Sequence, residues 1–254
     1  MRLGPGLLVL TLAVALAGCG GSKSDELSKA SSEGPIGKGS SGVWLFRPAG
    51  KPKNVVVYFH GQGGPKEATP ENHLPWINHL VKRGSIVVYP RYEMAYEADP
   101  MQFIVDGVKA AEKKVDVEGL PVLAIGYSRG GAIAVEYAAA AGRNGVPPPD
   151  WVMSVFPAPY GNQKKLIDLG QVPHFTQLVI LVGDRDEIVG TAGAVLLGRR
   201  LQRGGFPGEN IQVEQVMSHD SFTANHFAPM DTSKAAQTAF WAPADRILDE
   251  IDTQ

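Results

Sequence analysis

Cysteine is almost absent from this sequence, which has one in 254 residues. A chain with a single cysteine can form neither an internal disulfide nor a metal site built from several cysteines. The sequence also lacks an excess of positive charge, because 24 Lys and Arg stand against 26 Asp and Glu. A protein that neutralises the phosphates of nucleic acid needs such an excess, so we do not expect nucleic acid as a partner.

Long apolar runs are also missing, with the partial exception of Leu7–Ala17 near the N-terminus. This run is shorter than the roughly 20 residues of a membrane-spanning helix. It follows Arg2 and ends in small residues, which is typical of a secretory signal peptide. The end of the run, Leu16-Ala17-Gly18-Cys19, resembles the lipobox of bacterial lipoproteins. That resemblance implies cleavage before Cys19, lipidation of Cys19 with acyl chains such as palmitate, and anchoring to a membrane of the bacterial cell envelope. An ordinary signal peptide with a chance cysteine is the alternative.

The next segment, residues 20–42, is rich in Gly, Ser and Lys and has almost no large apolar side chains. Such a composition cannot bury enough surface to fold, so it predicts a flexible tether. The whole chain is 44% hydrophobic and 20% charged, as in soluble globular proteins. The sequence therefore predicts a signal peptide over 1–18, a tether over 19–42 and one folded domain over 43–254. It does not indicate an oligomeric state.

Apolar runs and helical patterns alternate through this domain. Runs typical of strands occur at Val43–Phe46, Asn54–Phe59, Ser85–Tyr89, Pro121–Gly126, Trp151–Phe156, Gln177–Val182 and Ile211–Met217. Helical spacing occurs at Pro70–Arg83, Met101–Val115, Gly130–Ala141, Ala192–Leu201 and Ser233–Ile251. Parallel strands need crossover connections, which helices supply, so the alternation predicts an α/β fold with a mostly parallel sheet. Functional residues are then expected at the carboxyl ends of the strands.

One motif has a chemical meaning in this context. Gly126-Tyr127-Ser128-Arg129-Gly130 is a G-x-S-x-G sequence between a predicted buried strand and a predicted helix. In that setting the motif forms a sharp turn that lifts the serine above the sheet edge, where it can act as a nucleophile. The helix N-terminus that follows favours developing negative charge. A glycine-rich turn that only joins strand to helix is the alternative.

With this motif the chain resembles the α/β-hydrolase family, over roughly Val43 to the C-terminus. The resemblance implies an α/β-hydrolase fold, with a mostly parallel central sheet and helices on both faces. It also gives a role to His60-Gly61-Gln62-Gly63-Gly64, which is similar to the family's H-G-x-G oxyanion loop. By this resemblance the backbone N–H groups of Gln62 and Arg129 face the substrate carbonyl oxygen, while His60 braces the loop.

The resemblance also implies an acid and a base that follow the serine in the chain. The family pattern G-x-x-D-x-x-V fits Gly183, Asp186 and Val189, which favours Asp186 over Asp184 as the acid. Two histidines are candidates for the base. His219 lies just past the last predicted strand and fits the family's small-residue–His–x–x–Phe pattern, so it is favoured over His226. His226 becomes the base if the loop between them folds back.

These residues predict a serine hydrolase that cleaves small carboxylic esters through an acyl-enzyme, without a metal or an organic cofactor. Only about twenty residues separate two of the predicted strands, 151–156 and 177–182, which leaves little room for a lid of several helices. An open site is therefore expected. A serine peptidase of the same fold and a non-catalytic, lipid-anchored binding protein are the alternatives.

Overall fold

The computed structural model of the protein describes residues 30–94, 99–159 and 166–253. The predicted signal peptide, Cys19 and the first part of the predicted tether lie outside the described residues. Among the helices of the described ranges, none combines the length and the apolar character needed to cross a membrane.

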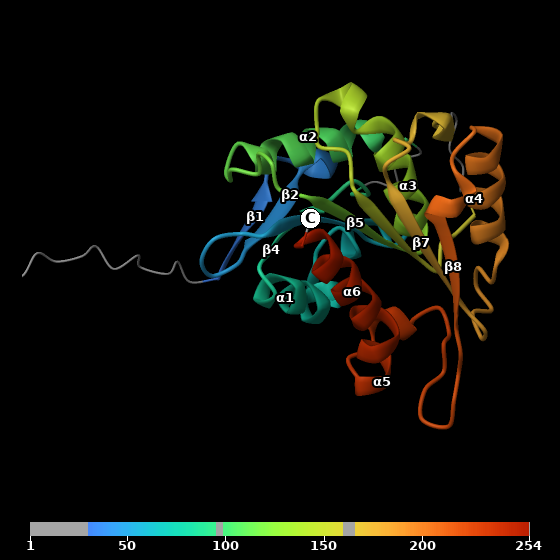
Figure 1. Ribbon diagram of the computed structural model, residues 1–254. Helices are drawn as coiled ribbons and strands as arrows, with labels where there is room; N and C mark the ends of the chain where they lie inside the picture. Colours follow the sequence, from blue (N-terminus) through green and yellow to red (C-terminus); the bar gives the residue numbers. More distant parts are fainter. Residues whose placement is uncertain (1–29, 95–98, 160–165, 254) are drawn as a thin grey trace, which may run out of the picture.

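An eight-stranded sheet forms the centre of the molecule, in the order β1-β2-β4-β3-β5-β6-β7-β8 (Figure 1). The first two pairings of this order, β1 with β2 and β2 with β4, are antiparallel, and all later pairings are parallel. The strands are β1 Ser31–Ile36, β2 Val43–Arg47, β3 Asn54–Phe59, β4 Ser85–Pro90, β5 Val122–Tyr127, β6 Trp151–Val155, β7 Gln177–Gly183 and β8 Ile211–Val216. The predicted mostly parallel sheet is confirmed.

Helices cover both faces of this sheet, as expected from its alternating buried residues (Figure 1). One face packs against α2 Met101–Glu112, α3 Arg129–Ala140 and α4 Ala192–Arg203. The other packs against α1 Leu74–Lys82, the short α5 Lys234–Ala236 and α6 Ala242–Ile251.

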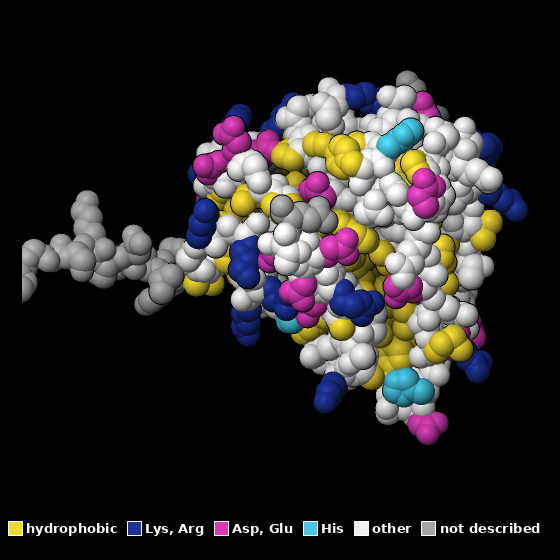
Figure 2. Space-filling view, in the orientation of Figure 1, with side chains coloured by type: hydrophobic (Ala, Val, Ile, Leu, Met, Phe, Trp, Pro, Cys, Tyr) yellow, Lys and Arg dark blue, Asp and Glu magenta, His cyan; other side chains and the backbone are white. Residues whose placement is uncertain are grey.

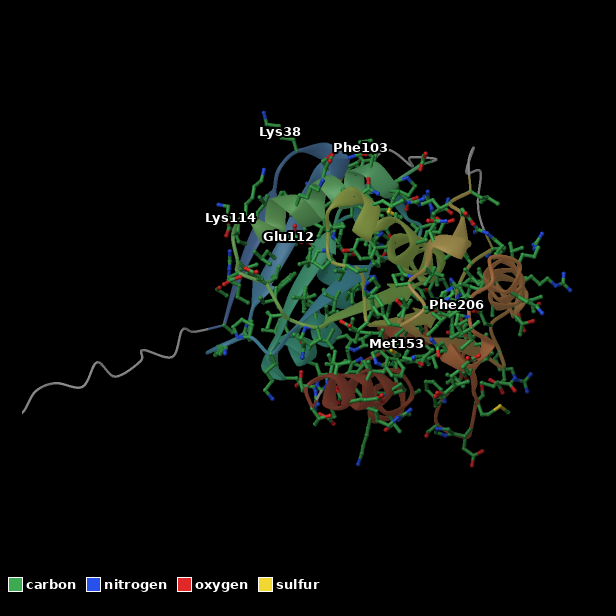
Figure 3. The ribbon with its side chains drawn as sticks, turned by 45° about the horizontal axis from the view of Figure 1, so that its top comes forward. Lys38, Phe103, Glu112, Lys114, Met153 and Phe206 are labelled. Atoms are coloured by element: carbon green, nitrogen blue, oxygen red, sulfur yellow. The ribbon has the colours of Figure 1, made fainter. Side chains whose placement is uncertain are left out.

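The two faces bury separate hydrophobic cores. In β3, Val55, Val57 and Phe59 belong to one core and Val56 and Tyr58 to the other, because successive side chains of a strand point to opposite faces. Figure 3 labels one side chain from each core: Met153 of β6, and Phe206, which follows α4. Burial on both faces explains why the central strands are continuous apolar runs in the sequence.

The folded part begins earlier than the sequence predicts. Within the predicted tether, Ser31–Ile36 forms β1 and pairs with β2 at one edge of the sheet. Its side chains are mostly exposed, and Ile36 packs against the core. The strand is held by backbone hydrogen bonds to its neighbour, which need no apolar side chains, so composition gave no sign of it. The domain boundary predicted at residue 43 is therefore too late by about one strand.

The C-terminal helix differs from the single helix predicted over Ser233–Ile251. Between α5 and α6 the chain makes a wider π-helical turn over Gln237–Trp241. Pro243 lies two residues after this turn, and proline has no N–H to donate to the carbonyl four residues earlier. A local π-turn accommodates such a break without ending the helix.

Phe240 belongs to the core that packs against α1 and α6. It is fully buried between Phe156 and Phe222, at ring-centroid distances of 5.4 and 6.2 Å. We expect Phe240→Ala to lower the free energy of unfolding by about 3–5 kcal/mol, because it leaves a cavity. Phe175→Ala makes the same change at a side chain that is 58% exposed, and is expected to cost less than about 0.5 kcal/mol. Urea denaturation of both variants measures the difference, and equal losses would contradict this assignment of the core.

Candidate active site

Ser128 occupies the sharp turn between β5 and α3, as its motif predicts. Its backbone has φ 56° and ψ −122°, a conformation that residues other than glycine rarely adopt. The flanking glycines make this turn possible. A Cβ atom on Gly126 would collide with the carbonyl oxygen of Gly130, and one on Gly130 would collide with the carbonyl oxygen of Phe59. The turn therefore packs too closely for a side chain at either of these two positions.

Two side chains from distant parts of the sequence meet at this serine. His226 Nε2 lies 2.9 Å from Ser128 Oγ, and His226 Nδ1 lies 2.8 Å from Asp186 Oδ2. All three residues are buried, with Ser128 8% and both Asp186 and His226 6% exposed. Because the Asp186 carboxylate accepts from Nδ1–H, Nε2 is left to accept the Ser128 hydroxyl proton. The structure thus forms a hydrogen-bonded chain of serine, histidine and carboxylate.

Asp186 lies in the loop after β7 and is fixed there by its second oxygen. Its Oδ1 accepts hydrogen bonds from the backbone N–H groups of Ile188 and Val189, at 3.0 and 3.1 Å. The other oxygen is therefore directed at the histidine. Of the two aspartates that the sequence offers here, the structure brings Asp186 to the histidine.

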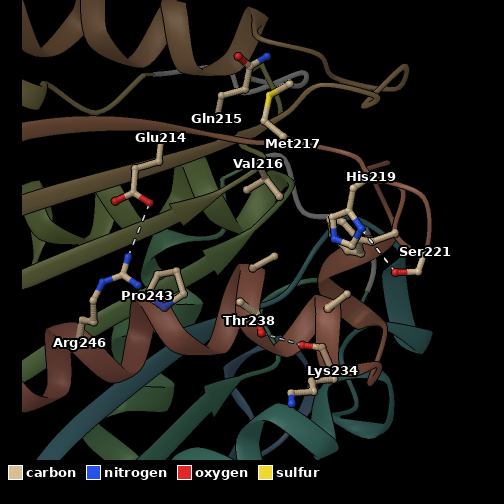
Figure 4. Close-up of a pocket in the computed structure, with 13 residues that line it drawn as sticks. Glu214, Gln215, Val216, Met217, His219, Ser221, Lys234, Thr238, Pro243 and Arg246 are labelled. Atoms are coloured by element: carbon tan, nitrogen blue, oxygen red, sulfur yellow. Dashed lines mark hydrogen bonds and ion pairs between the residues drawn. The ribbon is translucent and has the colours of Figure 1, made fainter.

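His219, the histidine favoured from the sequence, does not take this place, and the prediction that it lies beside Ser128 is wrong. Its Nδ1 lies 3.5 Å from Ser221 Oγ, and its ring lines a pocket of about 650 Å³ between β8 and the C-terminal helices (Figure 4). That pocket includes none of the three residues above. In Figure 2, hydrophobic side chains gather along the hollow between β8 and the C-terminal helices. The alternative, His226, fills the position next to the serine.

The chain reverses direction between the two histidines, which explains why His226 and not His219 lies beside Ser128. The backbones of His219 and Phe222 exchange hydrogen bonds of 2.8 and 2.9 Å, which closes a tight turn. Phe222 is buried beside Phe240, and Ala224 is fully buried. With this turn closed and these two residues buried, the chain returns toward the sheet edge, and His226 lies next to Ser128.

Asp184, the aspartate not selected as the acid, organises this loop. Its carboxylate accepts hydrogen bonds from the Ser218 hydroxyl at 2.6 Å and from the Ser218 N–H at 3.0 Å. The Ser218 hydroxyl donation lowers the pKa of the Asp184 carboxyl. The Ser218 oxygen in turn accepts from the N–H of Ala224 at 2.9 Å. Asp184 therefore ties the end of β7 to the loop that carries His226.

Tyr127 is a residue that the sequence reasoning did not single out. Its hydroxyl donates to the backbone carbonyl of His226 at 2.9 Å, and the two rings lie 5.3 Å apart. Burial raises the pKa of Tyr127 well above its usual value, so the hydroxyl keeps its proton. Tyr127 thus holds the histidine's backbone from the strand that carries the serine. Its place inside the G-x-S-x-G motif was the only sequence signal.

The predicted oxyanion loop lies against the serine. A Cβ atom on Gly61 would lie 3.4 Å from the Cβ of Ser128 and 3.1 Å from Tyr127 Cε1, so the loop passes in van der Waals contact with the turn. Gln62 follows and is exposed. Arg129 is the first residue of α3, so its backbone N–H belongs to the helix N-terminus, where partial positive charge accumulates. Both predicted N–H groups therefore come from segments that border Ser128.

His60 is the first residue of this loop. It is fully buried, its Nδ1 lies 2.7 Å from the Gly61 carbonyl oxygen, and its ring stacks on Tyr92 at 4.1 Å and 7°. Because the carbonyl can only accept, Nδ1 carries the proton. Burial lowers the pKa of His60 to about 3, so the ring is neutral. Within the described ranges, no three His, Cys, Asp or Glu side chains are grouped as ligands for a metal ion.

Comparison with solved structures identifies the fold. The α/β hydrolase MGS-M1 from a Medee basin deep-sea metagenome library matches with a TM-score of 0.60 and 16% identity, over 90% of this chain and 100% of that chain. Esterase B from Lactobacillus rhamnosis, inhibited by a tributyrin phosphonate, matches with a TM-score of 0.65 and 16% identity, over 89% and 86%. Esterase 2 from Thermogutta terrifontis, phosphoramylated by tabun, matches with a TM-score of 0.63 and 14% identity, over 91% and 97%. No protein-family model and no curated protein sequence matches the chain. The chain has the α/β-hydrolase fold.

The buried state of His60 has a measurable consequence. In the unfolded chain its ring takes up a proton at about pH 6.5, whereas the folded protein keeps it neutral down to about pH 3. The unfolded state then binds more protons below about pH 6.5, so this group makes the free energy of unfolding fall as the pH is lowered. We expect the NMR signal of the His60 ring to stay constant between about pH 5 and 8. An inflection in that range that disappears in His60→Gln would contradict this.

Proposed function

We propose that the protein is a serine hydrolase that cleaves carboxylic esters, with Ser128 as nucleophile, His226 as base and Asp186 as the orienting acid. The observation that carries the proposal is the continuous hydrogen-bonded chain from Asp186 through His226 to Ser128. The esterases among the structural neighbours support the reaction class at the level of the fold. The proposed base, His226, therefore differs from His219, which the sequence favoured.

The first half of the reaction forms an acyl-enzyme. As the Ser128 oxygen attacks the ester carbonyl carbon, His226 Nε2 accepts the hydroxyl proton. The carbonyl oxygen gains negative charge and accepts hydrogen bonds from the backbone N–H groups of Gln62 and Arg129. These donors need no reorganisation, and one such donor contributes about 3–4 kcal/mol to transition-state stabilisation. His226 then gives its proton to the departing alcohol.

The second half releases the acid. Water takes the place of the alcohol, His226 accepts a proton from it, and the resulting attack on the acyl carbon expels Ser128 with its proton restored. Asp186 stays ionised and stabilises the positively charged imidazole in both halves. Its two backbone hydrogen bonds keep it in place throughout.

A small apolar ester is the substrate class that the surroundings favour. Ile188 is 60% exposed and lies two positions after Asp186, and Phe227 is 59% exposed and directly follows His226. The Phe227 ring lies 5.8 Å from that of His226. Apolar side chains exposed beside a polar site can cover an alkyl or acyl group. The connection between β6 and β7 has 21 residues, too few for a lid of several helices, which supports an open site.

We also propose that the mature protein is exported and anchored to a membrane of the bacterial envelope through lipid on Cys19. The support is the sequence Leu16-Ala17-Gly18-Cys19 after an apolar run. Several acyl chains on one residue give stable attachment, where one chain gives only marginal binding.

The central test compares three variants against p-nitrophenyl butyrate. We expect Ser128→Ala and His226→Ala each to lower kcat by on the order of 10⁴-fold or more, because the members of a triad act as a unit. The matched control is His219→Ala, which removes the other late histidine and is expected to leave kcat within error of wild type. A fluorophosphonate should label wild type and fail to label Ser128→Ala.

Three results would count against the proposal. If Ser128→Ala keeps wild-type turnover, the protein is not a serine hydrolase that uses this residue. If wild type cleaves aminoacyl p-nitroanilides faster than the esters, it is a serine peptidase. A wild type that binds esters without cleaving them would indicate a binding protein.

The lipid anchor is tested by growth of expressing bacteria with radiolabelled palmitate. We expect label on the wild-type protein and recovery of that protein in the detergent phase of a Triton X-114 extraction. Cys19→Ser should lose both properties, because it removes the thiol that accepts the lipid. Equal labelling of the two proteins would exclude Cys19 as the acceptor.

A further inference from the structure

A buried carboxylate that the mechanism does not use lies under the oxyanion loop. Glu93 follows β4 by three residues, is 0% exposed and belongs to no hydrophobic core. Taking a carboxylate out of water costs several kcal/mol, so a fully buried Glu needs specific partners. Its partners come from both halves of the proposed oxyanion hole.

The first partner is the oxyanion loop itself. Glu93 Oε2 accepts a hydrogen bond from the backbone N–H of Gly63 at 3.1 Å. Gly63 directly follows Gln62, whose N–H is one of the two proposed oxyanion donors. The neighbouring Tyr92 donates its hydroxyl to the carbonyl of His60, at the other end of the same loop. Two consecutive residues after β4 therefore hold the loop at both ends.

The second partner is the residue after the nucleophile. Glu93 Oε1 forms an ion pair with the guanidinium of Arg129, whose side chain is 12% exposed. The backbone N–H of Arg129 is the other proposed oxyanion donor. The Glu93 carboxylate thus contacts both segments that carry a proposed oxyanion donor, the loop with Gln62 and the helix start with Arg129. These two segments are far apart in the sequence.

We propose that Glu93 is a positioning residue that fixes the two oxyanion donors relative to each other. This inference rests on the proposed function. Donors stabilise the transition state only when they are held about 2.7–3.1 Å from the place where the oxyanion forms. A charged clamp buried away from water is rigid, because breaking either contact leaves a charge or an N–H group unpaired. The loop and the turn already touch through Gly61 and Gly130, and Glu93 adds a charged contact between them.

The test compares an ordinary ester with the matching thionoester, in which sulfur replaces the carbonyl oxygen. Sulfur is a weak hydrogen-bond acceptor and gains little from the oxyanion donors. The wild-type ratio of kcat for ester over thionoester therefore measures how well the donors are placed. We expect Glu93→Gln to lower kcat for the ester by about 10²-fold, to change KM little, and to lower this ratio by a similar factor. Glu93→Asp should give a smaller loss.

The control is Glu118→Gln, the same change at an exposed glutamate, which should leave the ratio unaltered. If Glu93→Gln fails to fold because Arg129 is left without its counterion, the double variant Glu93→Gln/Arg129→Met removes that buried charge and is expected to show the same lowered ratio. Thermal unfolding of each variant verifies that it is folded.

The outcomes separate this inference from the proposed function. If wild type is active through Ser128 but the Glu93 variants keep the wild-type ratio, the inference is wrong and the function stands. An equal loss of kcat on both substrates would also overturn it, because a merely structural defect lowers both. A wild type that hydrolyses neither ester would overturn the proposed function, and this inference with it.

Discussion

The backbone turn at Ser128 is the constraint on which the rest of the site depends. A serine with φ 56° is in a conformation that costs about 1–3 kcal/mol and persists only where its surroundings enforce it. They do so through the N–H of Ser128, which donates to the Val155 carbonyl at 2.9 Å, and its carbonyl, which accepts from the N–H of Ala158 at 2.9 Å. Both contacts come from β6 and the residues just after it. The neighbouring strand therefore holds the turn, and the turn sets where the hydroxyl points.

The parts of the fold that follow from local pattern were predictable from the sequence. The seven predicted strands are all present, because buried strands of a parallel sheet are continuous apolar runs with recognisable ends. The eighth, β1, was missed since its exposed side chains resemble those of a linker and only pairing with β2 makes it a strand. The π-helical turn before Pro243 was missed for a related reason. A proline inside a helical pattern indicates a disturbance without specifying which form it takes.

In the candidate site, too, the residues in local motifs were predictable and those that depend on tertiary contacts were not. Ser128 and Asp186 stand in motifs that a few neighbouring residues define, and the structure brings both to one histidine. The histidine could not be chosen locally. His219 has the better local pattern, but the reversal of the chain at His219–Phe222 and the burial of Phe222 decide which ring reaches the serine. Glu93 could not be found from the sequence, because its proposed role depends on its contacts with Gly63 and Arg129, which only the fold brings together.

The spacing of the three hydrogen-bonded side chains along the chain has a consequence for biosynthesis. Ser128 and His226 are 98 positions apart, and β7, α4 and β8 all lie between them. The residues of β6 and just after it that hold the serine's turn, Val155 and Ala158, therefore come early in the chain, whereas the imidazole comes only after the last strand and the loop beyond it. A nascent or truncated chain that ends before residue 226 lacks the histidine that contacts Ser128 in the complete fold. The hydrogen bond between the imidazole and the Ser128 hydroxyl thus requires synthesis of the chain through residue 226.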